Sequence, residues 1–161
     1  MATLSVTITE SVTLNGSARG STNSLSITGV DDIYHRIVTV PAGSTDLTLV
    51  AFTSSMENRD GALDRDLVKY IRVTNLDSSN PVILNMQQRE DENASAVGDQ
   101  NLGLLLSAGK SFVMGEAKEC IDVEGGANDI DNLDNLHDLE SIMVDPLAAE
   151  VKVEVFIALV V

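Results

Sequence analysis

Residues 151–161 read Val-Lys-Val-Glu-Val-Phe-Ile-Ala-Leu-Val-Val, and this stretch predicts the fold class. Every odd-numbered position holds Val, Ile or Leu, whereas the even-numbered positions begin with Lys152 and Glu154. Such alternation is typical of a β-strand that turns one face toward a core. From Val155 onward the second face is apolar as well, so seven consecutive apolar residues stand at the end of the sequence.

A strand that is apolar on both faces is an aggregation hazard if it is left as an exposed edge. We therefore expect one of two coverings. Either the strand lies centrally between the two layers of a sandwich, as strands with this pattern often do, or its second face packs on another subunit. In the second case the candidate partner interface consists of Phe156, Ala158, Val160 and Val161.

The same period of two recurs along the rest of the chain, between segments rich in turn residues. We expect an all-β fold, an antiparallel β-sandwich of jelly-roll type with nine or ten strands and little helix, as one domain over residues 1–161. Residues 15–24 contain no apolar side chain larger than Ala and are predicted to be an exposed, mobile loop. Residues 62–67 are predicted to form one short helical turn. The other expected strands lie near residues 4–14, 25–27, 33–40, 47–52, 70–75, 82–86, 102–106, 111–114 and 139–144.

Composition and charge narrow the classes of function. The formal charge of −15 argues against direct binding to nucleic acid, because an acidic surface repels phosphates. Aromatic residues make up only 3% of the chain, so few are left over for a glycan-binding platform. No apolar run is long enough to cross a membrane, and the start of the chain does not resemble a secretory signal. The single cysteine excludes an internal disulfide.

Catalytic motifs are scarce in this sequence, and we expect no enzyme activity, no catalytic residues and no cofactor. The histidines are His35 and His137, and neither stands in a recognisable nucleophile arrangement. Cys120 is predicted to be a small buried apolar residue, as a lone cysteine in an acidic, valine-rich neighbourhood usually is. An acidic neighbourhood also raises the pKa of a thiol and suppresses its reactivity. The segment Gly109-Lys110-Ser111 lacks the preceding glycine that a phosphate-binding loop requires.

An acidic cluster is the strongest candidate for a metal site. Asp129, Asp131, Asp134 and Asp138 could supply oxygen ligands to Ca²⁺. The cluster departs from the EF-hand pattern, however, and we expect the surrounding segment to be a solvated acidic surface with at most weak cation binding. The prediction is therefore that the chain has no dedicated metal site.

Several segments together resemble small virion structural proteins of tailed bacteriophages, among which capsid decoration (cement) proteins are one role. They are residues 10–16 (ESVTLNG), 70–77 (YIRVTNLD), 106–112 (LSAGKSF), 139–142 (LESI) and 151–158 (VKVEVFIA). The resemblance implies a non-catalytic part of a virion that is made in the host cytoplasm. It also implies a symmetric homo-oligomer, with a trimer favoured, that binds the major capsid protein or another virion protein. It assigns no functional residue.

Three functions stay open at this point. The first is a capsid decoration protein that binds the outer surface of the shell and stabilises it. The second is a component of the tail, neck or fibre with a receptor- or glycan-binding role. The third is a metal-dependent enzyme, which would depend only on the acidic cluster.

Overall fold

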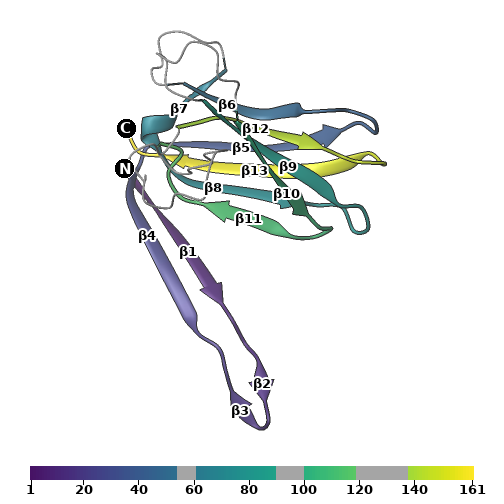
Figure 1. The fold of residues 1–161 in the computed structure, drawn as a ribbon. Coiled ribbons are helices and arrows are strands. Elements are labelled where there is room, and N and C mark those ends of the chain that lie inside the picture. Colours follow the sequence, from purple (N-terminus) through teal and green to yellow (C-terminus); the bar gives the residue numbers. More distant parts are fainter. Residues whose placement is uncertain (54–60, 90–99, 119–137) are drawn as a thin grey trace, which may run out of the picture.

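The computed structural model describes residues 1–53, 61–89, 100–118 and 138–161, which form a two-layered sandwich and a long hairpin that projects from it (Figure 1). Nine strands and a short 3₁₀ helix, η1, build the sandwich region. They are β5 (Asp32–Val40), β6 (Leu47–Thr53), β7 (Leu63–Asp64), η1 (Arg65–Leu67), β8 (Val68–Asn75), β9 (Val82–Arg89), β10 (Gln100–Leu106), β11 (Ser111–Met114), β12 (Asp138–Asp145) and β13 (Val151–Leu159).

The two facing sheets have the strand orders β10-β9-β12-β6-β7 and β11-β8-β13-β5. Apart from the parallel pair of β6 with the two-residue β7, all pairs within these sheets are antiparallel. If β7 is left out and the other eight strands, β5, β6 and β8 to β13, are renumbered 1 to 8 in chain order, the strand orders of the two sheets become 1-8-3-6 and 2-7-4-5. This is the connectivity of a jelly roll, so the predicted fold class is confirmed. The predicted helical turn is also present, as η1.

The core between the sheets is aliphatic, as a chain poor in aromatic residues requires. Val155 and Ile157 of β13 are fully buried in it, together with Ile71 and Val73 of the neighbouring β8. Phe52 also belongs to the core, whereas Tyr34 and Phe112 pack at its margin. β13, the strand whose sequence pattern predicted the fold class, is therefore a central strand that lies between β8 and β5.

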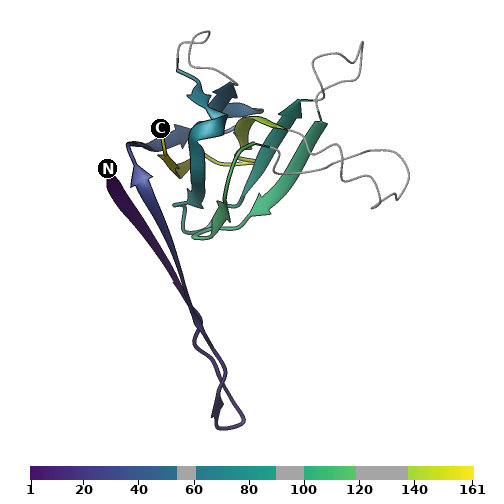
Figure 2. The ribbon, with the colours of Figure 1, turned by 90° about the vertical axis from the view of Figure 1, so that its left-hand side faces the viewer.

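The projecting hairpin, called the arm below, comprises residues 1–30. Its long strands β1 (Ala2–Thr9) and β4 (Thr22–Val30) pair antiparallel, and a second short pair, β2 (Thr13–Leu14) with β3 (Ser17–Ala18), forms the tip. Both chain ends lie near the base of the arm, and its tip points away from the sandwich (Figures 1 and 2). The arm adds to the sandwich a structure that the predicted strands had not indicated.

Residues 15–24 are exposed, as predicted, but the prediction that they form a loop is wrong, because these residues turn the arm and begin its return strand. Asn15 and Gly16 both have positive φ, at 50° and 77°, as a type I′ hairpin turn requires. Gly20 allows the two chains of the arm to approach closely, since a Cβ at this position would collide with the carbonyl oxygen of Glu10. Thr22 and Ser24, two of the polar residues that suggested a loop, instead pair with Thr9 and Thr7 of β1.

Candidate functional site

The arm is an amphipathic ribbon. Its register places Leu4 opposite Ile27 and Val6 opposite Leu25, and Ile8 continues the same face. Because side chains alternate across a strand, the intervening positions form the other face. That face consists of hydroxyl side chains: Thr3, Ser5, Thr7, Thr9, Thr22, Ser24, Ser26 and Thr28.

The apolar face of the ribbon is covered at its base and exposed farther out. Leu4, Val6 and Ile27 are half-buried, because they pack against a small cluster on the sandwich. Ile8 and Leu25 belong to the same face, yet they are 53% and 51% exposed. Val12 and Leu14 near the tip are exposed as well. The apolar face thus continues beyond the point at which its own sandwich stops covering it.

The cluster beneath the base of the arm lies on the outer face of the β11-β8-β13-β5 sheet. It contains Tyr70 of β8 and Ala158 of β13, with Val30 at the end of β4, and all three are buried. Phe156 and Val160 are half-buried beside them. The second apolar face of the last strand is therefore covered, over these residues, by the N-terminal hairpin of the same chain.

The rest of the outer face is open and follows the strand register. One row across the sheet runs Val113, Arg72, Phe156, His35, and the next runs Ser111, Thr74, Glu154, Ile37. Val113 and Ile37, at the two flanks, are 44% and 60% exposed. Ile33, on β5 nearer the arm, is 49% exposed. This face has a polar centre with apolar flanks.

The polar centre is held together by short charged hydrogen bonds. Arg72 Nη1 donates to Glu154 Oε2 at 2.7 Å and to Thr74 Oγ1 at 2.6 Å. His35 Nε2 lies 2.8 Å from Glu154 Oε1. The hydrogen bond from Arg72, followed by that with His35, lowers the pKa of Glu154 below its ordinary value of 4.5. The charges of Arg72 and Glu154 are thus matched to each other, which lowers the electrostatic cost of covering these two side chains.

Phe156 joins the polar centre to the apolar cluster. Its ring meets the rings of Tyr70 and His35 edge to face, with centroid distances of 6.1 and 5.7 Å. The guanidinium of Arg72 lies 5.8 Å from the centroid of the same ring. His35 is thus a partnered surface residue.

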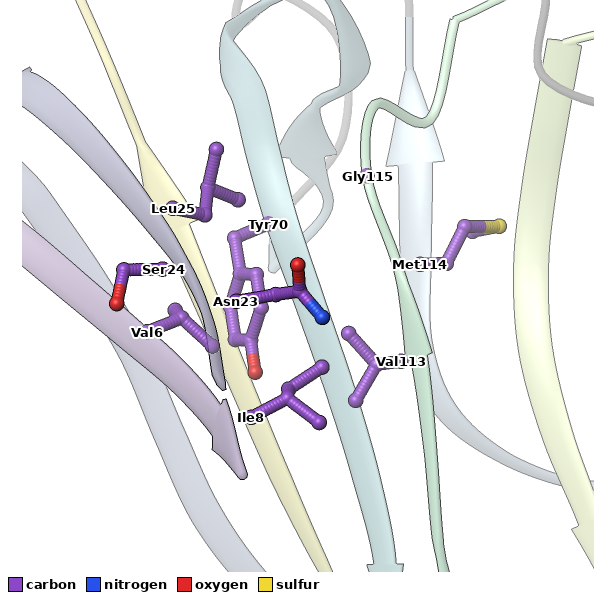
Figure 3. Close-up of a pocket in the computed structure, with 9 residues that line it drawn as sticks. All are labelled: Val6, Ile8, Asn23, Ser24, Leu25, Tyr70, Val113, Met114 and Gly115. Atoms are coloured by element: carbon purple, nitrogen blue, oxygen red, sulfur yellow. The ribbon is translucent and has the colours of Figure 1, made fainter. Parts of the chain in front are cut away.

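A cleft of about 230 Å³ opens where the arm diverges from the sheet. Val6, Ile8 and Leu25 contribute from the arm, and Tyr70 and Val113 from β8 and β11 (Figure 3). The ring of Tyr70 lies in the middle of the lining residues, while the side chain of Ile8 stands near Val113 (Figure 3). The exposed part of the ribbon and the open sheet face therefore meet along one largely apolar cleft.

Charge is divided unequally between the arm and the sandwich. Residues 1–30 contain one acid, Glu10, and one base, Arg19, so the entire formal charge of −15 falls on residues 31–161. The arm therefore has no net charge, although the protein as a whole is strongly acidic.

The metal candidates are only partly described. Asp129, Asp131 and Asp134 lie outside the described residues, as do Cys120 and His137. Asp138, at the start of β12, forms an ion pair in which its Oδ2 lies 2.8 Å from Nη2 of Arg65. Within residues 1–53, 61–89, 100–118 and 138–161, no three His, Cys, Asp or Glu side chains are grouped as metal ligands.

The candidate partner residues at the end of the chain divide into two groups. Phe156, Ala158 and Val160 lie together beneath the base of the arm, and Ala158 is fully buried. Val161 is 75% exposed. The distal arm residues Ile8 and Leu25 were not among the sequence candidates. The sequence signal that could have indicated them is the alternation of Leu4, Val6 and Ile8, followed by the Asn15-Gly16 hairpin turn.

Comparisons with protein-family models, with curated proteins and with solved structures gave no match. In the part of the chain that the structure describes, no helix has the length and hydropathy needed to span a membrane.

Proposed function

We propose that this chain is a non-enzymatic structural protein of a virus particle, in the capsid decoration role, which binds the outer surface of the shell and stabilises it. The observation that carries the proposal is the arm, an amphipathic hairpin without net charge whose apolar face extends beyond the part that its own sandwich covers. An element of this kind gains stability only when another surface covers it, because an isolated two-stranded hairpin is marginal in water.

Two further features support the proposal. The jelly roll occurs in viral capsid proteins, although it also occurs in lectins and other classes, so the fold alone does not decide the function. The sequence segments that resemble virion structural proteins of tailed phages point to the same class.

The second candidate is a tail, neck or fibre component that binds a receptor or a glycan. The same jelly-roll fold favours it, because lectin domains share this architecture. Glycan recognition by aromatic stacking would require an exposed ring, however. Tyr34, Phe52, Tyr70, Phe112 and Phe156, which are all the aromatic residues of the chain, are buried or half-buried. The decoration role is therefore the better supported of the two.

Copy number per particle tests the proposal. Quantitative mass spectrometry of purified virions should find this chain in numbers comparable to those of the major capsid protein. Purified chain should also bind to shells that lack it, and the bound shells should resist heating better than bare ones. A count of only a few copies per particle would contradict the decoration role and favour the tail, neck or fibre.

A further inference from the structure

We propose that the cleft between the arm and the β11-β8-β13-β5 sheet is a binding site for a small uncharged organic molecule. The ligand has an apolar body about the size of a substituted benzene ring and one hydrogen-bonding group. That group meets the hydroxyl of Tyr70, while Ile8, Leu25 and Val113 enclose the body. The inference goes beyond the proposed function and does not depend on it.

Tyr70 is the side chain that points to a ligand. It is only 5% exposed, and its hydroxyl end is directed toward Ile8 in the middle of the residues that line the cleft (Figure 3). Tyr34, which is less buried, donates its hydroxyl to the carbonyl oxygen of Leu49 at 3.1 Å. The hydroxyl of Tyr70, in contrast, forms no hydrogen bond with any residue that the structure describes. Because an unpaired hydroxyl in an apolar setting is costly, a hydrogen-bonding guest in the cleft would be stabilised there.

The rest of the lining suits an organic molecule better than water. Four of the lining side chains are aliphatic, and the polar residues beside Tyr70 are Asn23 and Ser24. Both are already engaged, since Asn23 Nδ2 donates to Ser21 Oγ at 3.2 Å and Ser24 Oγ lies 3.4 Å from Thr7 Oγ1. A stably bound water needs two to four polar partners. Water beside Tyr70 finds few, so its displacement by an apolar body favours binding.

The charges around the cleft require an uncharged ligand. None of the nine lining residues is charged. Arg72, which adjoins Val113 on the sheet, is bound to Glu154 at 2.7 Å. An anion would be repelled by the formal charge of −15. A cation would lose its hydration without gaining a carboxylate partner in the lining.

The size of the cleft favours a small molecule. Its volume is about 230 Å³, and an apolar cavity of about 150 Å³ is enough for benzene, so a ring with one or two substituents fits. A protein partner would need a broad surface, since a standard interface buries about 800 Å² on each side. This cleft is instead a crease between two elements of one chain, with the charged pair of Arg72 and Glu154 beside it on the sheet.

The experiment uses p-cresol and toluene as probes, because they differ only by a hydroxyl group. Each is titrated into the full chain, and binding is followed by the NMR shifts of backbone amides and methyl groups. For a ligand of about eight heavy atoms we expect p-cresol to bind with a Kd on the order of 10⁻³ M. It should shift the resonances of Val6, Ile8, Leu25 and Val113. Toluene should bind the same site more weakly, by roughly 3–10-fold.

Two variants test the assigned roles. Tyr70→Phe removes the hydroxyl and keeps the ring, so it should abolish the preference for p-cresol and leave the binding of toluene unchanged. Ile8→Ala removes part of the apolar wall and should weaken both probes by roughly tenfold. The matched control is Thr7→Ala, the neighbouring position on the opposite face of β1, and it should change neither. Unchanged amide shifts away from the cleft should show that the variants are folded.

Three results would overturn the proposal. The first is the absence of a saturable shift at the cleft residues. The second is a preference for p-cresol that survives Tyr70→Phe. The third is binding of p-cresol that weakens as the protein concentration rises, because a second chain would then be the occupant of the cleft. None of these results depends on binding to shells, so the decoration role is tested separately.

Discussion

Truncation of Phe156 tests the packing between the base of the arm and the sandwich. Phe156 lies on the outer face of β13, where it contacts Tyr70 and His35 edge to face. It also borders the cluster that holds Leu4 of the arm. The substitution Phe156→Ala removes the ring and leaves the inward-facing core residues of β13 untouched. The variant therefore reports on the attachment of the arm.

The expected magnitude follows from burial. A fully enclosed phenylalanine buries roughly 200 Å², so a half-buried one removes about 100 Å² from water. At about 25 cal/mol per Å² this corresponds to about 2.5 kcal/mol, and the two ring contacts add about 0.5 kcal/mol or more. We expect Phe156→Ala to lower the free energy of unfolding by about 3 kcal/mol. Leu4→Ala, also half-buried, should cost about 1 kcal/mol.

A double-mutant cycle shows whether the two residues share one contact surface. The effects of Phe156→Ala and Leu4→Ala should fail to add by about 0.5–1 kcal/mol, because both side chains pack on the same cluster. The control pairs Phe156→Ala with Thr3→Ala, which lies next to Leu4 but on the hydroxyl face. That pair should add within about 0.5 kcal/mol. The measurement is equilibrium unfolding in denaturant.

Two outcomes would refute this reasoning. If Phe156→Ala costs less than about 0.5 kcal/mol, in the range of ordinary surface substitutions, the ring is not packed as described. If the cycle with Leu4 is strictly additive, the base of the arm does not rest on the outer face of the sheet.

Three further predictions concern the sandwich itself. Ile157→Ala should lower the free energy of unfolding by about 2–5 kcal/mol in a thermal or denaturant melt, because the side chain is fully buried between the sheets. Asn75→Ala should cost about 1–3 kcal/mol in the same assay, since the buried amide donates to the carbonyl oxygens of Asn80, at 2.8 Å, and Leu106, at 3.1 Å. Arg72 and His35 hold the pKa of Glu154 below 4.5 in the folded state, so its contribution is present above that pH and lost as the pH falls through the folded value. The difference in melting temperature between wild type and Glu154→Gln should therefore be largest near neutral pH and shrink in acid.

The fold class could be predicted because it depends on local patterns. Alternation in residues 151–161 identified a strand covered on both faces, and the structure places β13 centrally in its sheet with a fully buried inner face. A jelly-roll-like sandwich was predicted from strand number and spacing, whereas the order of the strands within the two sheets comes from the structure. The turn near residues 62–67 followed from local sequence in the same way.

The arm could not be predicted as readily, because it depends on which strands pair. The alternation of Leu4, Val6 and Ile8 fits a strand at the edge of a sandwich as well as it fits a projecting ribbon. Residues 15–24 are rich in Gly, Ser and Asn, which favour loops, and only pairing with β1 makes β4 a strand. The outer covering of Phe156 and Ala158 was missed for the same reason, since it comes from residues far away in the sequence.

The base of the arm protects part of β13 from solvent, but the rest of the arm then has no cover of its own. The sandwich encloses the inner face of β13, the base of the arm covers its outer face around Ala158, and β8 and β5 pair with its two edges. The arm that provides part of this cover carries its own apolar side chains, Ile8 and Leu25, into solvent. Natural proteins commonly protect exposed strands with charges or proline, but within residues 1–30 there is no proline and there are only two charged residues.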